Sequence, residues 1–315
     1  MFRKATIVLA TTALVGPSAT ALGTPSAYSN YCALHPHKSY CWDRHHHPRL
    51  AHPHEQSKGA SDVAACDESK DVELSIRACA QLIEKNPQDV VAYYNRGVDY
   101  DDRKDYDRAI ADYTKAIKID PNEVAANSNR GYAYTHKQDD THAFADYAKA
   151  IEIDPGYADT YFNRGNGYDD MKNFDRAVAE YSKAIELDPK KADFYSDRGL
   201  AYAANGHYDR AIADYDTALE LDPNDPQAYD SRGGAYVGLG DYIRADADFT
   251  KSIELYPQHA TAYEHRGYAR FYRGSFKLAA TDLSRSLELK DNASPMLFRF
   301  LARSRGRGKR FPPRA

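Results

Sequence analysis

Hydrophobic and polar positions repeat along most of the chain with a period of 34 residues. Within each period, small and aromatic residues recur at spacings of three and four, which is the spacing of one helix face. Every period contains two such stretches with a short polar turn between them, and a proline follows the second stretch in all but the last. Because the residue before a proline avoids the helical region, that proline marks the end of the second helix. The pattern therefore predicts a chain of helix pairs.

The block of residues 90–123 shows the predicted helix pair most clearly. Its recurring positions hold an aromatic, a glycine and an aromatic in the first helix, then an alanine, an aromatic, an alanine and the final proline. In order these residues are Tyr93, Gly97, Tyr100, Ala109, Tyr113, Ala116 and Pro121. A glycine inside a helix costs about 1 kcal/mol relative to alanine, so its return needs a packing reason. We expect that the missing side chain lets the second helix lie close, with the small alanine opposite completing the contact.

These seven positions resemble the consensus of the tetratricopeptide repeat family, which stacks antiparallel helix pairs into a right-handed superhelical solenoid. The match continues through five successive units, 90–123, 124–157, 158–191, 192–225 and 226–259. A weaker unit follows at 260–291 and a degenerate unit precedes at 62–89, as is common for terminal units that face water on one side. The resemblance implies an all-α solenoid over residues 62–302, closed by a capping helix at 293–302.

An arginine precedes the glycine of each unit, and an acidic residue precedes the aromatic of each second helix. We predict that the two residues pair within each unit, as Arg96 with Asp112. Six copies of one pair suit an architectural contact better than a catalytic site. Each such exposed pair would contribute less than about 1 kcal/mol.

Residues 1–21 have the three parts of a secretory signal peptide. Residues 1–4 include two basic side chains, residues 5–15 are apolar and uncharged, and an Ala-Thr-Ala sequence ends at Ala21. We expect cleavage after Ala21, with Ala27 as the second choice. An uncleaved membrane anchor is the alternative, although the apolar run is short for a span. The expected location of the mature chain is the bacterial periplasm or the outside of the cell.

Residues 22–61 are rich in proline and histidine and show no apolar periodicity, which predicts a loosely ordered arm. The arm holds seven of the twelve histidines, and such clusters can bind zinc or copper. Its spacing matches no structural zinc motif, so we favour a polar linker with a Cys32–Cys41 disulfide, and metal handling is the alternative. A second disulfide is predicted between Cys66 and Cys79, where two buried thiols are the alternative and export favours the bond.

Charge is distributed unevenly along the chain. Residues 62–290 contain 43 acidic and 29 basic residues, whereas the segment from residue 291 contains one acidic and seven basic residues. The chain is therefore predicted to be an acidic solenoid with a basic tail over residues 303–315. The favoured interpretation is a soluble acidic surface with a tail that keeps the protein near anionic lipid or does little. The alternatives are an envelope adaptor held by its basic tail and an acidic groove that prefers basic partners.

The resemblance implies that the residue two before each glycine faces the concave side of the solenoid. Asn95, Asn129 and Asn163 hold this position in three successive units. An asparagine amide both donates to and accepts from a peptide backbone, so three in register would hold an extended peptide, as in the asparagine ladders of some tetratricopeptide proteins. Asparagines on the helix surface that bond to water are the alternative.

Acidic pairs lie near the ends of two first helices, where negative charge opposes the helix dipole and favours a basic partner. These residues are Asp101, Asp102, Asp169 and Asp170. Together with the asparagines, they predict a concave groove that binds basic peptide segments.

No motif for catalysis or cofactor binding occurs in the sequence. It contains no G-x-S-x-G elbow, no phosphate-binding glycine loop and no H-E-x-x-H. A net charge of -4 argues against a nucleic-acid partner, and the lack of an 18-residue apolar stretch argues against a transmembrane span. The sequence therefore predicts a non-enzymatic scaffold, without a cofactor, that binds protein or peptide segments outside the cytosol.

Overall fold

The computed structural model describes residues 49–50, 60–69 and 71–289 of the chain, and all the statements below refer to these residues. They form fourteen helices and no strand, and consecutive helices pack as antiparallel pairs. In chain order the helices are α3 (Ala60–Glu68), α4 (Val72–Lys85), α5 (Val90–Asp102), α6 (Tyr106–Ile119), α7 (Val124–His136), α8 (Asp140–Ile153), α9 (Ala158–Asp170), α10 (Phe174–Leu187), α11 (Ala192–Ala204), α12 (Tyr208–Leu221), α13 (Pro226–Gly238), α14 (Tyr242–Leu255), α15 (Ala260–Tyr272) and α16 (Phe276–Leu289).

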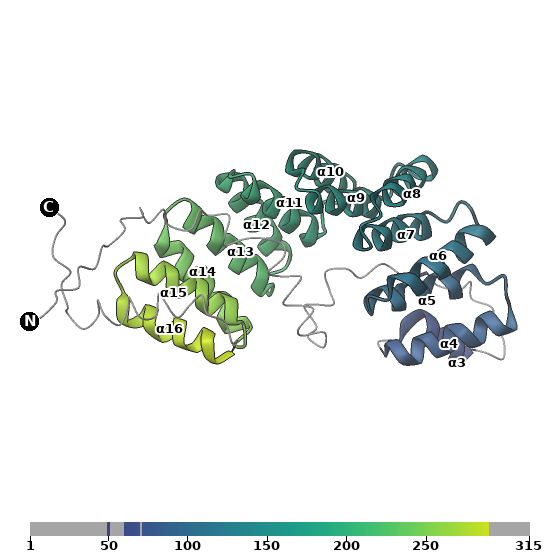
Figure 1. The fold of residues 1–315 in the computed structure, drawn as a ribbon, viewed down its shortest axis with the longest axis horizontal. Coiled ribbons are helices and arrows are strands. Elements are labelled where there is room, and N and C mark those ends of the chain that lie inside the picture. Colours follow the sequence, from purple (N-terminus) through teal and green to yellow (C-terminus); the bar gives the residue numbers. More distant parts are fainter. Residues whose placement is uncertain (1–48, 51–59, 70, 290–315) are drawn as a thin grey trace, which may run out of the picture.

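The helix pairs follow one another along an arc (Figure 1). The first helices of consecutive units contact each other, as α7 does with α9, more extensively than the second helices do. The first helices therefore line the inner side of the arc, and we call the face they form the inner surface. The predicted all-α solenoid is confirmed for the described residues.

The turn inside each unit keeps one backbone geometry although its sequence varies. One residue of each turn lies in the left-handed region, and it is glycine in three units and lysine or glutamine in the other three. These residues are Lys104, Gln138, Lys172, Gly206, Gly240 and Gly274. The residue that follows usually caps the second helix, as Asp105 does by accepting from the backbone N–H of Arg108. The capped turn therefore fixes the helix pair without a strict need for glycine.

The glycine that follows the paired arginine in each of the six units makes room for the aromatic or leucine side chain of the second helix. A Cβ atom added at Gly165 would lie 2.6 Å from the Tyr181 ring, which is itself buried. The prediction that this glycine allows close packing is correct. The predicted alanine also lies close in two units, where its carbonyl oxygen is 3.0 Å (Ala143) and 3.5 Å (Ala279) from an added Cβ, but the larger side chain of the second helix is nearer. The glycine accommodates the ring that lies four residues beyond that alanine.

The predicted arginine–acid pairs are present in all six units. Arg96 donates from Nε and Nη2 to the two carboxylate oxygens of Asp112, at 2.7 and 2.8 Å. The equivalent pairs are Arg130–Asp146, Arg164–Glu180, Arg198–Asp214, Arg232–Asp248 and Arg266–Asp282. The expectation that they are exposed is wrong, because Asp112 is only 6% exposed. Burial raises the pKa of Asp112, although Arg96 beside it acts in the opposite direction.

The N-terminal unit departs from the others. Helix α3 has 9 residues where α5 has 13, and a disulfide joins Cys66 on α3 to Cys79 on α4, with their Cα atoms 4.9 Å apart. None of the helices in the described part of the chain combines the length and apolar character that a membrane crossing requires.

Several predicted features lie outside the described residues. They are the signal peptide at 1–21, the Cys32–Cys41 disulfide, nearly all of the arm at 22–61, the capping helix at 293–302 and the tail at 303–315.

Candidate peptide-binding surface

The three predicted asparagines lie on successive first helices, Asn95 on α5, Asn129 on α7 and Asn163 on α9, and all are buried. Asn129 donates from Nδ2 to the Tyr94 hydroxyl at 2.9 Å, and Asn163 donates to the Ser128 hydroxyl at 3.1 Å. Both acceptors lie 35 residues earlier, on the preceding first helix. These two amides therefore link one unit to the next.

This linkage differs from the predicted ladder at Asn129 and Asn163. A side chain that faces inward from one first helix also faces the neighbouring first helix, because consecutive units lie in contact. Once such an amide is buried, it needs a partner from the protein itself. The same register recurs near the other end, where His265 bonds to Asp230. At this position, therefore, the side chain bonds to the neighbouring first helix rather than to a ligand.

Asn95 donates to Asp67 on the preceding first helix α3, at 3.2 Å, and also has a second kind of partner. Its Oδ1 accepts from the backbone N–H of Leu50 at 3.0 Å, and its Nδ2 donates to the Leu50 carbonyl at 2.8 Å. One amide thus holds both polar groups of one residue, which is the bonding predicted for an asparagine that binds a peptide backbone. The bound segment is the chain's own arm.

The residue before Leu50 is held through its side chain. Arg49 donates from Nη1 to the Cys66 carbonyl and to the Ser75 hydroxyl, each at 2.8 Å, and Nη2 forms an ion pair with Asp99. Asp99 is fully buried. Burial raises the pKa of the Asp99 carboxyl, and Arg49 partly offsets that rise. Leu50 packs against the apolar cluster that contains Tyr94 and Val98. These groups form a complete site for an arginine and its neighbour.

Sequence reasoning missed Asp99 and Ser75, although the repeat itself singles them out. Asp99 stands where the later units have small residues, and Ser75 stands where they have alanine. The residues equivalent to Asp99 are Ala133, Gly167, Ala201, Ala235 and Ala269, and those equivalent to Ser75 are Ala109, Ala143, Ala177, Ala211, Ala245 and Ala279. A comparison of units position by position would have found both departures.

The predicted acidic residues lie on both sides of α7. Burial raises the pKa of Tyr132, and the charges of Asp101 on α5 and Asp170 on α9 raise it further. Two carboxylates from units 68 residues apart thus act on one hydroxyl. Burial and the charge of Asp170 raise the pKa of Asp169 to about 7. Carboxylates of α5 and α9 thus act on the same region of α7.

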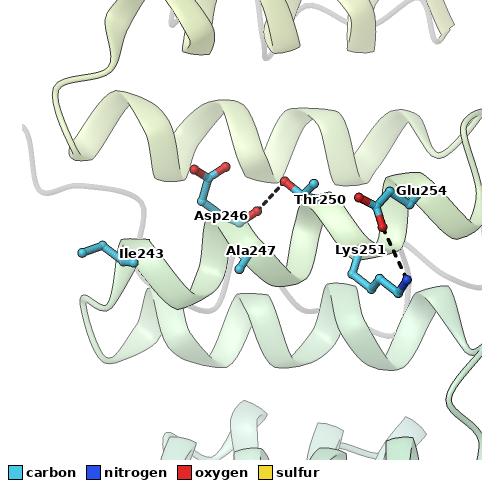
Figure 2. Close-up of a pocket in the computed structure, with 6 residues that line it drawn as sticks. All are labelled: Ile243, Asp246, Ala247, Thr250, Lys251 and Glu254. Atoms are coloured by element: carbon cyan, nitrogen blue, oxygen red, sulfur yellow. Dashed lines mark hydrogen bonds and ion pairs between the residues drawn. The ribbon is translucent and has the colours of Figure 1, made fainter.

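A hollow of about 410 Å³ lies elsewhere, on the second helix α14, and another of about 470 Å³ lies at the start of the same helix. Figure 2 shows the residues that line the first, Ile243, Asp246, Ala247, Thr250, Lys251 and Glu254. Its polar groups already have partners within α14 and on the next unit. Thr250 donates to the Asp246 carbonyl at 2.7 Å and accepts from Arg266 at 3.0 Å, and Lys251 lies 3.4 Å from Glu254. The Asp246 carboxylate pairs with Arg270 and Arg273. This shallow hollow offers no convergent chemistry for a ligand. Among the described side chains, no group of three or more His, Cys, Asp or Glu is placed to hold a metal ion.

The helix pairs, their register and the recurring contacts define a helical repeat solenoid. Sequence profiles of the tetratricopeptide repeat family match residues 90–123, 124–157, 162–226 and 226–259. The chain belongs to the tetratricopeptide repeat family. Repeats of this family form protein–protein interaction scaffolds, and this chain has that architecture. No curated protein matches the sequence.

Several solved structures have the same fold. The Cut9–Hcn1 hetero-tetramer of APC/C matches with a TM-score of 0.65 and 16% identity, over 88% of this chain and 51% of the other. PilF of Pseudomonas aeruginosa matches with a TM-score of 0.60 and 18% identity, over 70% and 99%. The C-terminal part of a TPR repeat-containing protein from Cytophaga hutchinsonii matches with a TM-score of 0.55 and 21% identity, over 76% of this chain and 99% of the other. The chain spans about half the length of the first, and the likeness concerns the fold alone.

Proposed function

We propose that the protein is a non-enzymatic scaffold that binds extended, basic peptide segments along its inner surface. The observation that carries this proposal is the bound Arg49–Leu50 segment. Its backbone is held by Asn95 and its positive charge by Asp99, which are the two kinds of contact that such a peptide requires. The protein therefore already holds a short basic peptide of its own on this surface.

Charge along the inner surface supports a preference for basic segments. Asp101 lies on α5, and Asp169 and Asp170 lie at the end of α9. Negative charge at a helix C-terminus opposes the dipole, so a positively charged ligand there removes an unfavourable interaction.

We further propose that the protein works outside the cytosol, in the periplasm or after secretion. The signal-peptide pattern of residues 1–21 supports export. The disulfide between Cys66 and Cys79 supports an oxidising compartment. The two alternatives, metal handling by the arm and an adaptor held by the tail, depend on segments outside the described residues.

Binding of short labelled peptides to the full chain tests the proposal. A lysine–glycine peptide is expected to bind more tightly than a glutamate–glycine peptide of equal length, and the difference should shrink as salt rises to about 0.3 M. Asp169→Asn with Asp170→Asn is expected to remove the preference. The matched control is Asp209→Asn with Glu220→Gln, which removes two exposed charges from the second helix α12. Equal binding of the two peptides by the unaltered chain would overturn the proposal.

A further inference from the structure

The contacts of Arg49 and Leu50 specify a ligand more narrowly than basic charge does. Arg49 uses two guanidinium nitrogens to reach three acceptors, namely Asp99, Ser75 and the Cys66 carbonyl. An ammonium group is a compact point charge and lacks the planar fork that spans these acceptors. The site therefore distinguishes arginine from lysine.

The next residue is recognised by its backbone and by an apolar side chain. Asn95 binds both backbone polar groups of Leu50, which fixes the direction of the chain. The Leu50 side chain packs against the cluster around Tyr94 and Val98. A large aliphatic residue after the arginine satisfies both conditions.

The site belongs to the first unit because no full unit precedes it. In the next two units, the equivalent amides of Asn129 and Asn163 donate to side chains of the preceding first helix. Asn95 donates likewise to Asp67 on α3, and its amide binds the backbone of Leu50 in addition. The amide that links units elsewhere therefore also binds a peptide backbone here.

Burial of Asp99 makes the empty site unfavourable. The carboxylate is fully buried, and a buried charge without a counter-charge is strongly destabilising. The site therefore keeps an arginine, and a different arginine enters most easily by exchange with Arg49. In the other units the equivalent position is alanine or glycine, so the carboxylate is not needed for stacking.

We propose that Asn95, Asp99, Ser75 and the Cys66 carbonyl form a recognition site for an arginine followed by a large aliphatic residue, and that Arg49–Leu50 occupies it as an exchangeable internal ligand. The incoming ligand is a protein segment that carries the same pair in an extended backbone. This inference rests on the proposed function, since it names the ligand for one end of the same surface. Because the arm is covalently attached, Arg49–Leu50 has a high effective concentration at the site. An incoming segment must therefore bind tightly enough to displace it.

The test uses the full chain and a labelled peptide with the sequence of residues 46–53. In the unaltered chain the arm competes with this probe. In a chain with Arg49→Ala and Leu50→Ala, the competitor is weakened, and the probe is expected to bind at least about tenfold more tightly, as measured by fluorescence anisotropy. Thermal unfolding of both chains checks that the altered arm leaves the solenoid folded.

Specificity is tested in that altered chain. A probe with lysine in place of arginine, or alanine in place of leucine, is expected to bind about tenfold more weakly. Asp99→Asn should weaken the original probe to a similar degree. Ser75→Ala should weaken it several-fold and preserve the fold, because alanine holds this position in the six later units. Asp209→Asn on α12 is the matched control and should have no effect.

The result that overturns the inference is equal affinity of the probe for the two chains, or equal binding of the lysine and alanine probes. Arg49–Leu50 would then be a structural cap of the first unit. The lysine–glycine peptide separates this failure from failure of the proposed function. If that peptide still binds with the preference removed by Asp169→Asn and Asp170→Asn, the broader proposal stands without this site.

Discussion

At the scale of single residues, stability depends on a few contacts that recur in every unit. The glycine of the first helix is one of them, and α9 offers a direct test because it contains two helical glycines. An added Cβ at Gly165 would meet the buried Tyr181 ring at 2.6 Å, whereas one at Gly167 would lie 3.5 Å from Phe144, at ordinary contact distance.

Gly165→Ala is therefore expected to lower the free energy of unfolding by about 1–3 kcal/mol, through overpacking. Gly167→Ala should be neutral or raise it by up to about 1 kcal/mol, because alanine favours helix. Chemical denaturation of the two variants measures both effects. Equal shifts in the same direction would show that the ring contact does not select glycine.

Asp169 gives a pH-dependent prediction at the same scale. Its pKa is raised to about 7 by burial and by Asp170, so the folded chain binds a proton that the unfolded chain releases near pH 4. The carboxyl therefore costs stability as pH rises from about 4 to about 7. Asp169→Asn should be more stable than the unaltered chain at pH 8 by about 1–3 kcal/mol, and similar to it near pH 4.

Denaturation at several pH values measures this difference. Asp209→Asn, which removes an exposed carboxylate on α12, controls for the change in net charge. A stability gain for Asp169→Asn that does not change with pH would contradict the assignment of the raised pKa to this residue.

At the scale of helices, the repeat pattern predicts the residues and contacts that every unit shares. It does not predict those that occur in a single unit. Spacing was enough to predict the helix pairs and the contact of Arg96 with Asp112. It did not reveal the partner of Gly165, because a ring that fills the space left by a glycine leaves no mark in spacing. It also did not reveal Asp99, because a search for recurring residues passes over a residue that occurs once.

The asparagines show a second limit of sequence reasoning. The pattern placed Asn95, Asn129 and Asn163 on the inner side but said nothing of how closely consecutive first helices approach. That approach buries Asn129 and Asn163 and gives their amides partners. Asn95 bonds to Asp67 on the preceding helix and, in addition, to the backbone of Leu50.

The disulfide of the N-terminal unit gives a testable prediction at the scale of helices. Cys66 on α3 and Cys79 on α4 close a loop with a sequence separation of 13, and the Cys66 carbonyl also accepts from Arg49. Reduction is expected to lower the stability of α3 and α4 by about 2–3 kcal/mol in the chain-entropy model. Hydrogen exchange resolved to peptides measures this loss with and without reductant.

The loss should be confined to the N-terminal unit, because each unit of a solenoid contacts only its neighbours. Exchange in α13 and α14 is the internal control and should stay unchanged. Equal protection of α3 and α4 in the two states would contradict a stabilising role for the bond.

At the scale of the whole molecule, the units form one inner surface, on which we propose that charge and backbone recognition act together. The first helices form this surface and the second helices form the outer side of the arc (Figure 1). The described arm segment lies at its amino-terminal end against α5, and the acidic residues of α9 lie two units further along the stack. We therefore expect ligands to bind on the inner surface and not on the outer side of the arc.

The most direct test of this central claim is hydrogen exchange of the full chain with and without a saturating arginine- and leucine-containing basic peptide. We expect slower exchange in the first helices α5, α7 and α9, and unchanged exchange in the second helices α6, α8 and α10. Protection confined to the second helices, or none in any described helix at saturation, would contradict binding along the inner surface.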